Sequence, residues 1–439
     1  MQIERLILYD FRGIHELELE LNGKSTILYG INGVGKSSIL AAVNLLYANI
    51  INKIVNQKFK QSIKFEESDI KYKKAAATIA AEFGFEDTKE TFCFSRQNHR
   101  ANTKMIKPVK NQFDELIDHF RQLYIGRVTV DEDNNLVYQN EKFNLPIFIN
   151  YGVNRLVLKT PLRINKKQSY GQFAAYEKAI ENQIAFDRLF EWFLEQELYE
   201  IQLKKENKDY EDISLKAVKT AMLAMLDGYK EIHIAVKPYS MKVYKGNEVL
   251  DILQLSDGEK CTLALFGDLA RRLAIANPSM GNPLEGRGVV LIDEVELHMH
   301  TQWQRKIINV LKNTFPNIQF IITTHSPQVL GEISSEFNVV SLRREGDEVL
   351  CEPVCPYFGV DSNVVLEDAM YTDSVSHIVK EKVNNMYTLL DNKRYDEAEK
   401  AADEIDQITL KRNVDTVRAR MIIRKGRRIN AVYTKESGT

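Results

Sequence analysis

The chain has 439 residues, of which 44% are apolar and 27% are charged, a composition typical of a globular protein with a large core. Its 59 Lys and Arg nearly balance its 61 Asp and Glu, and the net charge of −2 excludes binding of nucleic acid by a basic surface as a whole. There is no apolar run of about 18 residues, and Met1 leads directly into a strand pattern. We therefore expect a cytoplasmic protein without a membrane segment.

Residues 1–48 are expected to form a hairpin, a strand, a glycine-rich turn and a helix. Leucine and glutamate alternate before residue 21, which is typical of an antiparallel strand with one face in water. Asn22-Gly23 then turns the chain into the apolar strand Thr26–Tyr29. From Gly30 to Ser37 the residues fit the pattern G-x4-G-K-S, and an apolar helix follows.

This glycine-rich pattern is suited to binding phosphate. Backbone N–H groups of the turn can surround an anion, and the N-terminal partial charge of the following helix points to the same place. Lys36 adds a positive charge at the β and γ phosphates, and Ser37 offers a hydroxyl to Mg²⁺. We therefore expect ATP and Mg²⁺ as cofactors, with these nucleotide-binding residues: Asn32, Gly33, Gly35, Lys36, Ser37 and Ser38.

Residues 49–144 have less regular patterns, and a mostly helical section lies further along the chain. A stretch between Glu90 and Asp114 contains basic but no acidic residues, which indicates either a solvated face or a contact with phosphates or a partner. An apolar strand at 145–150 ends in the polar turn Tyr151–Arg155, where α/β proteins present side chains to a ligand. Strands are also expected around 77–85 and 91–95, and helical segments at 113–123, 173–194 and 213–226.

A second anion site is indicated by the motif Leu255–Glu259, which follows strands expected between residues 232 and 253. Ser256 would cap the helix that begins here, so Ser256, Gly258 and the next backbone N–H groups could bind a phosphate. Alone, the motif also fits a simple capped helix. Because of the motifs around it, we include Ser256, Gly258 and Glu259 among the nucleotide-binding candidates.

Two acids follow the buried strand Gly288–Ile292, an arrangement typical of a Walker B motif. Asp293 would hold Mg²⁺ together with Ser37, and Glu294 is placed to orient or deprotonate the attacking water. A further apolar strand ends at His325, where a histidine can sense the γ-phosphate. The catalytic candidates are therefore Glu294 and His325, and the metal ligands are Ser37 and Asp293.

In this order, the motifs resemble the ABC-type ATPase head shared by RecF, SMC and OLD-like proteins, over most of the chain. The resemblance implies an α/β fold, a P-loop NTPase with a mixed sheet and an inserted, mostly helical lobe. It also implies a homo-oligomer, at least a head-to-head dimer, in which Ser256 and Gly258 of one head contact ATP on the other. The glutamine that usually couples ATP to the lobe has no clear match; Gln97 and the turn Tyr151–Arg155 are both candidates.

The resemblance leads us to expect a chain that alternates between head and lobe. The expected regions are the N-terminal part of the head with Walker A (1–48), lobe strands with an inserted helix (49–150), a mainly helical lobe (151–230), the C-terminal part of the head (231–345) and a helical region (346–439).

Two sets of residues admit a metal-site interpretation. Glu296, His298 and His300 follow Walker B directly, but this place resembles the D-loop of these ATPases, which crosses the dimer. Cys351 and Cys355 form a C-x3-C pair without a second pair or a nearby histidine. We favour the D-loop for the first set and reduced thiols for the second.

The last hundred residues separate the branches of the family. An OLD-like nuclease would continue into a metal-binding toprim domain with an Asp-x-Asp motif, which is not evident here. Instead, Tyr357–Asp368 and the helical patterns after it resemble short prokaryotic AAA-type ATPases, including the PtuA group of Septu and retron-linked antiphage systems. Such ATPases work with a separate effector, an HNH nuclease in Septu. The basic segment Lys411–Arg428 fits a solvated helix face or a docking surface.

We therefore expect an ATP-hydrolysing sensor or regulator of an antiphage complex that controls a separate nuclease. One alternative is a RecF-like DNA-repair clamp, and another is a scaffold or binding module that holds ATP and hydrolyses it slowly. Direct contact with nucleic acid stays open in all three interpretations.

Overall fold

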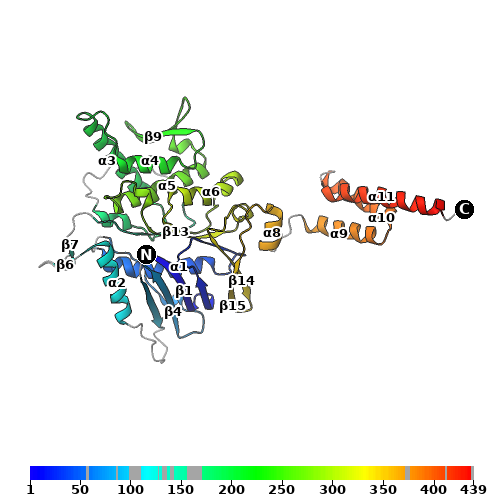
Figure 1. Cartoon of the computed structure of the whole chain (residues 1–439), viewed down its shortest axis with the longest axis horizontal. Coiled ribbons are helices and arrows are strands. Elements are labelled where there is room, and N and C mark those ends of the chain that lie inside the picture. Colours follow the sequence, from blue (N-terminus) through cyan, green and yellow to red (C-terminus); the bar gives the residue numbers. More distant parts are fainter. Residues whose placement is uncertain are drawn as a thin grey trace. The chain divides into compact units, whose positions relative to one another are not determined.

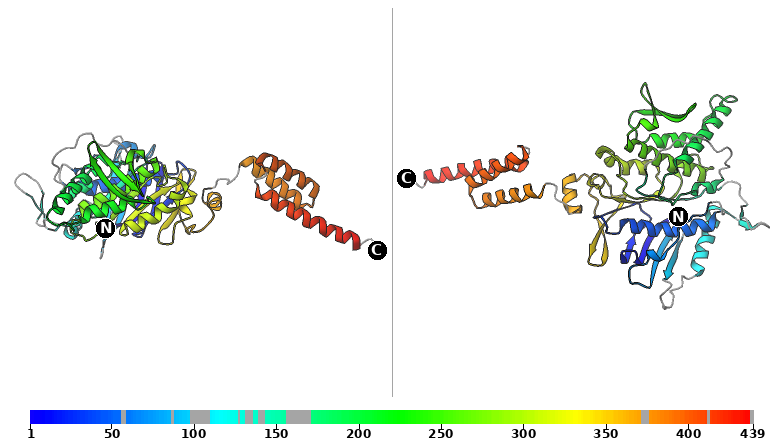
Figure 2. Two further views of the ribbon diagram at one scale, coloured as in Figure 1. Left: turned by 90° about the horizontal axis from the view of Figure 1, so that it is seen from above. Right: turned by 180° about the vertical axis from the view of Figure 1, so that it is seen from behind.

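The computed structural model describes residues 1–55, 59–85, 88–97, 110–126, 128–130, 136–138, 143–155, 171–370, 376–410 and 413–436. The chain divides into two compact units, residues 1–365 and residues 366–439 (Figure 1). Further views of the same ribbon are given in Figure 2.

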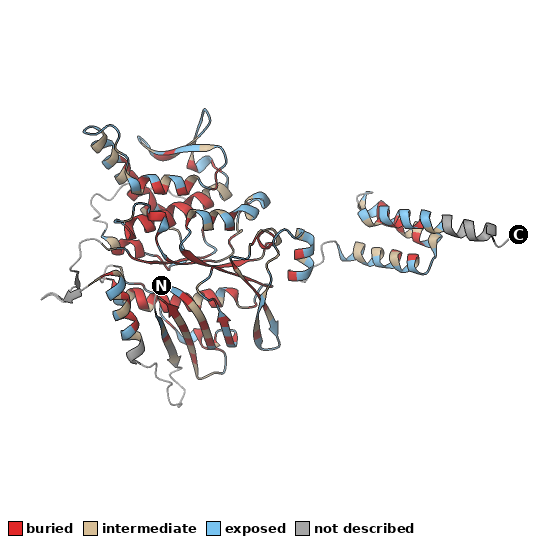
Figure 3. Ribbon diagram, viewed as in Figure 1, coloured by how far each residue is buried: buried red, intermediate tan, exposed pale blue. Residues whose placement is uncertain are grey.

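A six-stranded mixed sheet forms the centre of the first unit, in the order β15-β14-β3-β13-β12-β8. Its strands pair in parallel except for β15, which is antiparallel to β14. Strands β3, β8, β12 and β13 are buried along their whole length, as in a parallel sheet covered on both faces (Figure 3). The strands span Thr26–Tyr29 (β3), Ile147–Tyr151 (β8), Gly288–Ile292 (β12), Ile318–Thr324 (β13), Asn338–Glu345 (β14) and Glu348–Val354 (β15).

A four-stranded antiparallel sheet, in the order β2-β1-β4-β5, contains the predicted N-terminal hairpin. Asn22 and Gly23 both adopt positive φ angles, 51° and 65°, as the predicted turn requires. The strands span Gln2–Phe11 (β1), Ile14–Glu20 (β2), Ala76–Gly84 (β4) and Lys89–Gln97 (β5); a separate pair is formed by Val128–Val130 (β6) and Leu136–Tyr138 (β7).

Helix α1 (Lys36–Ile54) contacts strands of both sheets and lies between them in Figures 1 and 2. Among the described helices it alone is long and apolar enough to cross a membrane. Its apolar character has another explanation, because 67% of the apolar window is buried inside the protein. Helix α2 (Lys110–Tyr124) packs on β5 and α1.

The lobe combines helices with a small antiparallel sheet in the order β11-β10-β9. The three strands were expected, although we assigned residues 231–345 to the head. The predicted helical segment at 173–184 is wrong for its second half. Only Gln172–Tyr176 forms a 3-10 helix, because Lys178 and Asn182 adopt positive φ angles that no helix tolerates. The elements are α3 (Phe186–Lys204), α4 (Ile213–Leu223), β9 (Tyr229–Val236), β10 (Tyr239–Lys245), β11 (Glu248–Asp251) and α5 (Asp257–Ala276).

Shorter elements complete the first unit. Helix α6 (Thr301–Thr314) packs against α7 (Pro327–Leu330). We expected the C-terminal helical region to begin at residue 346. This residue instead lies in the turn between β14 and β15, and the strand β15 continues to Val354. Helix α8 (Ser362–Met370) contains the division between the units, and 3-10 turns occur at Glu67–Asp69, Ile252–Gln254 and Pro283–Glu285.

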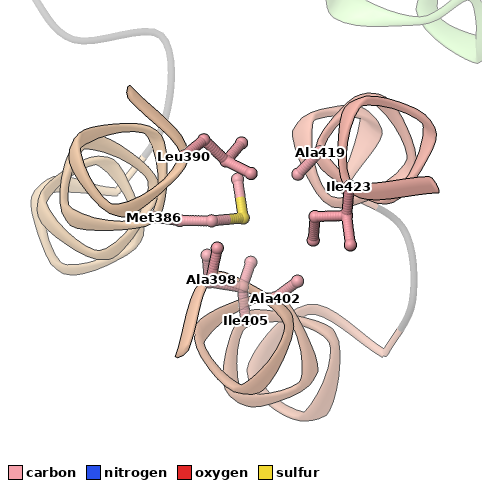
Figure 4. Packing of buried hydrophobic residues seen from close by; sticks show 7 residues of the cluster. All are labelled: Met386, Leu390, Ala398, Ala402, Ile405, Ala419 and Ile423. Carbon is pink, nitrogen blue, oxygen red and sulfur yellow. The ribbon is translucent and has the colours of Figure 1, made fainter. Parts of the chain in front are cut away.

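The second unit is a three-helix bundle of α9 (His377–Asp391), α10 (Tyr395–Thr409) and α11 (Val414–Glu436). A small core holds it together (Figure 4): Met386, Leu390, Ala398, Ala402, Ile405, Ala419 and Ile423. Arg420 of the basic segment pairs with Asp403 and Asp406 of α10, each at 2.7 Å. Part of that segment therefore faces acidic side chains of its own bundle.

Candidate nucleotide-binding and catalytic site

The chain passes from β3 to α1 through a glycine-rich turn that follows the carboxyl end of the strand. Gly30 has to be a glycine here, because a Cβ atom would lie 2.3 Å from the carbonyl oxygen of Leu342. Gly33 and Gly35 have φ angles of 80° and 117°, and the loop tip at residues 31–33 is exposed. This turn leaves its backbone N–H groups open to a ligand.

The side chain of Lys36 lies back across this turn and is only 5% exposed. Its Nζ donates hydrogen bonds to the carbonyl oxygens of Gly30 (2.8 Å) and Ile31 (3.0 Å). Burial lowers the pKa of Lys36 to about 8, against the attraction of the carboxylates that follow β12. A buried ammonium held by carbonyl dipoles is favoured by an adjacent anion, so the residues present fit a bound phosphate.

The two predicted magnesium ligands lie together although they are 256 residues apart in the chain. The Ser37 hydroxyl donates to Asp293 Oδ2 at 3.0 Å, and the Thr323 hydroxyl donates to Asp293 Oδ1 at 2.6 Å. The backbone N–H of Asp293 donates to the Tyr151 carbonyl at 2.9 Å, which fixes the residue at the ends of β12 and β8. Hydroxyl and carboxylate oxygens are ligands that Mg²⁺ accepts, so this pair fits the predicted metal.

Glu294, the predicted base, has a φ angle of 47°, which is unusual for a residue other than glycine. Its backbone N–H donates to the Thr323 hydroxyl at 2.7 Å, and its carbonyl oxygen accepts a hydrogen bond from Arg155 Nη2. Sequence reasoning missed Thr323 altogether and named Arg155 only as the end of a polar turn. The position of Thr323 near the end of the strand before His325 was the available signal.

The segment after β13 is joined to the segment after β12 by Glu296. Its carboxylate accepts hydrogen bonds from the Thr324 hydroxyl (2.9 Å) and the His325 backbone N–H (2.5 Å), and burial raises the pKa of Glu296. Burial also lowers the pKa of His325, and the positive charge of Lys36 acts in the same direction. In the site without nucleotide, both effects favour the neutral imidazole of His325.

The alternative metal sites are not formed. The Glu296 carboxylate accepts the hydrogen bonds from Thr324 and His325. His300 Nδ1 accepts a hydrogen bond from the Gln302 backbone N–H at 3.4 Å, at the start of α6. Within the described ranges, no group of three His, Cys, Asp or Glu residues could hold a metal ion. Cys351 and Cys355 are free thiols, and burial raises the pKa of Cys351 to about 12.

The motif at the start of α5 forms the predicted helix cap. The Ser256 hydroxyl accepts the Glu259 backbone N–H at 3.3 Å, and the Glu259 carboxylate accepts from the Ser256 backbone N–H at 2.9 Å. Tyr229 donates to the same carboxylate at 3.1 Å, so Glu259 is engaged within the motif. Gly258 permits a close approach, because a Cβ atom there would lie 2.7 Å from the carbonyl oxygen of His298.

Ser256 is exposed, and among the described residues no hydrogen bond or ion pair joins it, Gly258 or Glu259 to the P-loop. The structure therefore brings together Lys36, Ser37, Asp293, Glu294 and His325 and leaves the α5 motif as a separate helix N-terminus.

A hollow of about 410 Å³ opens beside Ser37 and Asp293. Its lining includes Arg12, whose Nε lies 2.8 Å from Asp69, and Asn44 of α1. The turn after β8 contributes Gly152, Val153 and Asn154, so this turn adjoins the site, whereas the side chain of Gln97 lies outside the described residues. The hollow provides room for a ligand next to the P-loop.

Comparisons with known proteins identify several relatives of this chain. The chain is 28% identical to the Retron Ec83 probable ATPase of Escherichia coli over 393 residues, which cover 76% of this chain and 70% of that protein. It is 28% identical to the Retron Vc95 probable ATPase of Vibrio cholerae serotype O1 biovar El Tor (76% and 72% covered). It is also 25% identical to the Septu protein PtuA of Bacillus mycoides (strain KBAB4), covering 91% of this chain and 49% of that one.

Among solved structures, the chain is similar to the SMC head domain from Thermotoga maritima, with 17% identity and a TM-score of 0.42, over 81% of this chain and 100% of that chain. The fold class is confirmed: the protein is an α/β P-loop NTPase with a mixed sheet. Residues 25–331 match the family described as "AAA domain, putative AbiEii toxin, Type IV TA system". Since this match spans the P-loop, the Walker B strand and His325, and more than half of the chain, the protein belongs to that AAA domain family.

Proposed function

We propose that this protein binds and hydrolyses ATP with Mg²⁺ at the site between β3, β12 and β13. The observation that carries the proposal is the 3.0 Å hydrogen bond between Ser37 and Asp293, beside the buried Lys36. Lys36 and the P-loop N–H groups bind the phosphates, and Ser37 and Asp293 hold the ion. When bound, Mg²⁺ neutralises charge on the β and γ phosphates.

Glu294 is the general base in this proposal. It follows the metal ligand directly, and its charge acts on both Lys36 and His325. A carboxylate beside the γ-phosphate can orient a water molecule and accept its proton. A ring N–H of His325 then donates a hydrogen bond toward the same phosphate.

We further propose that two heads form a dimer around ATP. Support comes from Ser256, which is exposed at the N-terminus of α5 and is not joined to its own P-loop. Ser256 and Gly258 of one subunit would contact the γ-phosphate held by the other. Glu259 would act indirectly, by holding Ser256 in place.

The similarity to retron ATPases and to Septu PtuA supports a role as the ATP-dependent sensor or regulator of an antiphage system. In this proposal the nucleotide state controls a separate nuclease, such as an HNH protein, in the cytoplasm. Reconstitution with a nuclease encoded beside this gene tests it: DNA cleavage should differ between the wild type and a variant that holds ATP without hydrolysing it. Equal cleavage in both would contradict the regulatory role.

ATP turnover and solution mass test the enzymatic proposal, each with and without DNA. Glu294→Gln should reduce turnover by at least about 100-fold and accumulate an ATP-bound dimer, because the water loses its base. Glu336→Gln is the matched control, since Glu336 is exposed beside Lys24 and Ile318, at the amino ends of β3 and β13. Unchanged turnover in Glu294→Gln would contradict its role as base, and strong stimulation by DNA would favour the repair-clamp alternative.

A further inference from the structure

Arg155 connects two parts of the proposed catalytic machinery. It ends the turn after β8, and its side chain is only 2% exposed. Its Nη2 donates to the carbonyl oxygen of Glu294, and its own carbonyl oxygen accepts a hydrogen bond from the Cys261 thiol at 3.5 Å. Cys261 lies on α5, which begins at the capping motif of Ser256. Arg155 thus contacts both the proposed base, Glu294, and helix α5.

Arg155 donates its hydrogen bond to Glu294 at a point where the backbone has an unfavourable conformation. A glutamate in the left-handed region is strained, and such a conformation persists only where the surroundings hold it. Glu294 is held from both sides, at its N–H by Thr323 and at its carbonyl by Arg155. Because Thr323 also donates to Asp293, the base and the metal ligand share one support.

Among the described residues, the Arg155 guanidinium does not find a hydrogen-bond partner for every buried nitrogen. Arg155 Nη1 is buried and has no hydrogen-bond partner within the described part of the chain. Burial lowers the pKa of Arg155, while Cys261 and the carboxylates of Glu296, Asp293 and Glu294 act in the opposite direction. The carboxylates of Glu296, Asp293 and Glu294 therefore offset part of the cost of burying this cation.

We propose that Arg155 is a positioning residue for ATP hydrolysis, which holds Glu294 in its strained backbone conformation and couples it to α5. This inference rests on the proposed ATPase function and adds Arg155 to the residues on which hydrolysis depends. When the N-terminus of α5 contacts the phosphate on the other subunit, a movement of the helix at Cys261 is passed through Arg155 to the carbonyl of Glu294. Nη1, which has no partner among the described residues, provides a second donor for a hydrogen bond to a shifted carboxylate.

The competing explanation is that Arg155 only fills the core. In that case its substitution would lower the melting temperature and impair nucleotide binding and turnover together. A positioning role instead predicts a loss of kcat with little change in KM or in the Kd for ATP, because the P-loop contacts stay intact.

The experiment compares Arg155→Gln and Arg155→Lys with the wild type, Glu294→Gln and a matched control. The control is Arg188→Gln, which removes another largely buried guanidinium (18% exposed) paired with Glu177 and Glu191. We measure kcat, KM, the Kd for a fluorescent ATP analogue and the melting temperature. Arg155→Gln should lose about 100-fold in kcat, with KM and Kd within about threefold, as expected for a misaligned base.

Two further readouts separate positioning from packing. Arg155→Lys keeps the charge and one donor, so it should restore about tenfold of the lost kcat, and it serves as the test if the glutamine variant does not fold. The double variant Arg155→Gln/Glu294→Gln should turn over as slowly as Glu294→Gln alone, because Arg155 acts through that residue. Independent losses that multiply would overturn the inference.

The outcomes also distinguish this inference from the ATPase proposal. Turnover in Arg155→Gln equal to that of Arg188→Gln, beside an inactive Glu294→Gln, would overturn the role of Arg155 alone. A wild type without turnover would contradict the ATPase proposal itself and the inference with it.

Discussion

The hydroxyl of Tyr151 donates a 2.9 Å hydrogen bond to Asp268, a carboxylate on α5 with no exposed surface. Arg271 and Arg272 each donate to the same carboxylate at 2.7 Å. Since the carbonyl of Tyr151 accepts the N–H of Asp293, this buried cluster ties α5 to the strand ends at the site. The cluster therefore holds helix α5 in a fixed position relative to strand β8.

Asp268→Asn should lower the free energy of unfolding of the first unit by about 3–5 kcal/mol, because it leaves two buried guanidinium groups without a counter-charge. Urea unfolding followed by circular dichroism measures this effect. Asp209→Asn, in the exposed loop after α3, is the control and should change stability by less than about 0.5 kcal/mol. A loss for Asp268→Asn no larger than the control's would contradict the structural role of the cluster.

Gly258→Ala tests the close contact between α5 and the loop after Walker B. Alanine is the better helix former by about 1 kcal/mol, so a free helix position would gain stability. Here the Cβ would meet the His298 carbonyl at 2.7 Å, and we expect a loss of about 1–3 kcal/mol instead. Gly281→Ala is the control, because nothing lies within 4 Å of its Cβ. A stabilised Gly258→Ala protein would show that the loop moves away without cost.

ATP affinity should depend on pH through Lys36. Burial lowers the pKa of Lys36 to about 8 without nucleotide, and a bound phosphate favours the charged form. The Kd for ATP should therefore rise above pH 8, by up to about tenfold per pH unit, and this group should add no slope below pH 7. Titrations between pH 6.5 and 9.5 measure the slope. Lys36→Met should bind more weakly and lose this slope; a slope that remains would assign it to another group.

The interaction between His233 and Glu197 in the lobe, called the clasp below, should depend on pH. A hydrogen bond to Glu197, at 2.9 Å, raises the pKa of His233 above its ordinary value of about 6.5. The clasp therefore stabilises the fold fully below pH 6.5, and its contribution is lost as the pH rises through the folded-state pKa. Urea unfolding of the wild type and His233→Gln at pH 5.5 and 8.5 measures it. The two proteins should differ more at pH 5.5; an equal difference at both pH values would contradict the clasp.

Several predictions of local structure are confirmed for a common reason. The hairpin before residue 21, the glycine-rich turn at Gly30 and the cap at Ser256 depend on residues close together in the chain. Where a local pattern was ambiguous, the prediction was wrong: Phe173, Tyr176, Ile180 and Ile184 lie at helical spacing, but a 3-10 helix ends at Tyr176 and turns follow. The roles of Glu294, His325 and Ser256 stay predictions until turnover is measured.

The sequence by itself determined the P-loop, the capped α5 and the acidic end of β12, because each is a short pattern whose spacing dictates its backbone. Tertiary structure alone decided that Ser37 meets Asp293, that Thr323 supports both acids, and that Arg155 lies behind Glu294. These contacts follow from the sheet order β3-β13-β12-β8, which differs from the order along the chain. The order of strands is set by how whole buried faces pack, and no short stretch of residues encodes it.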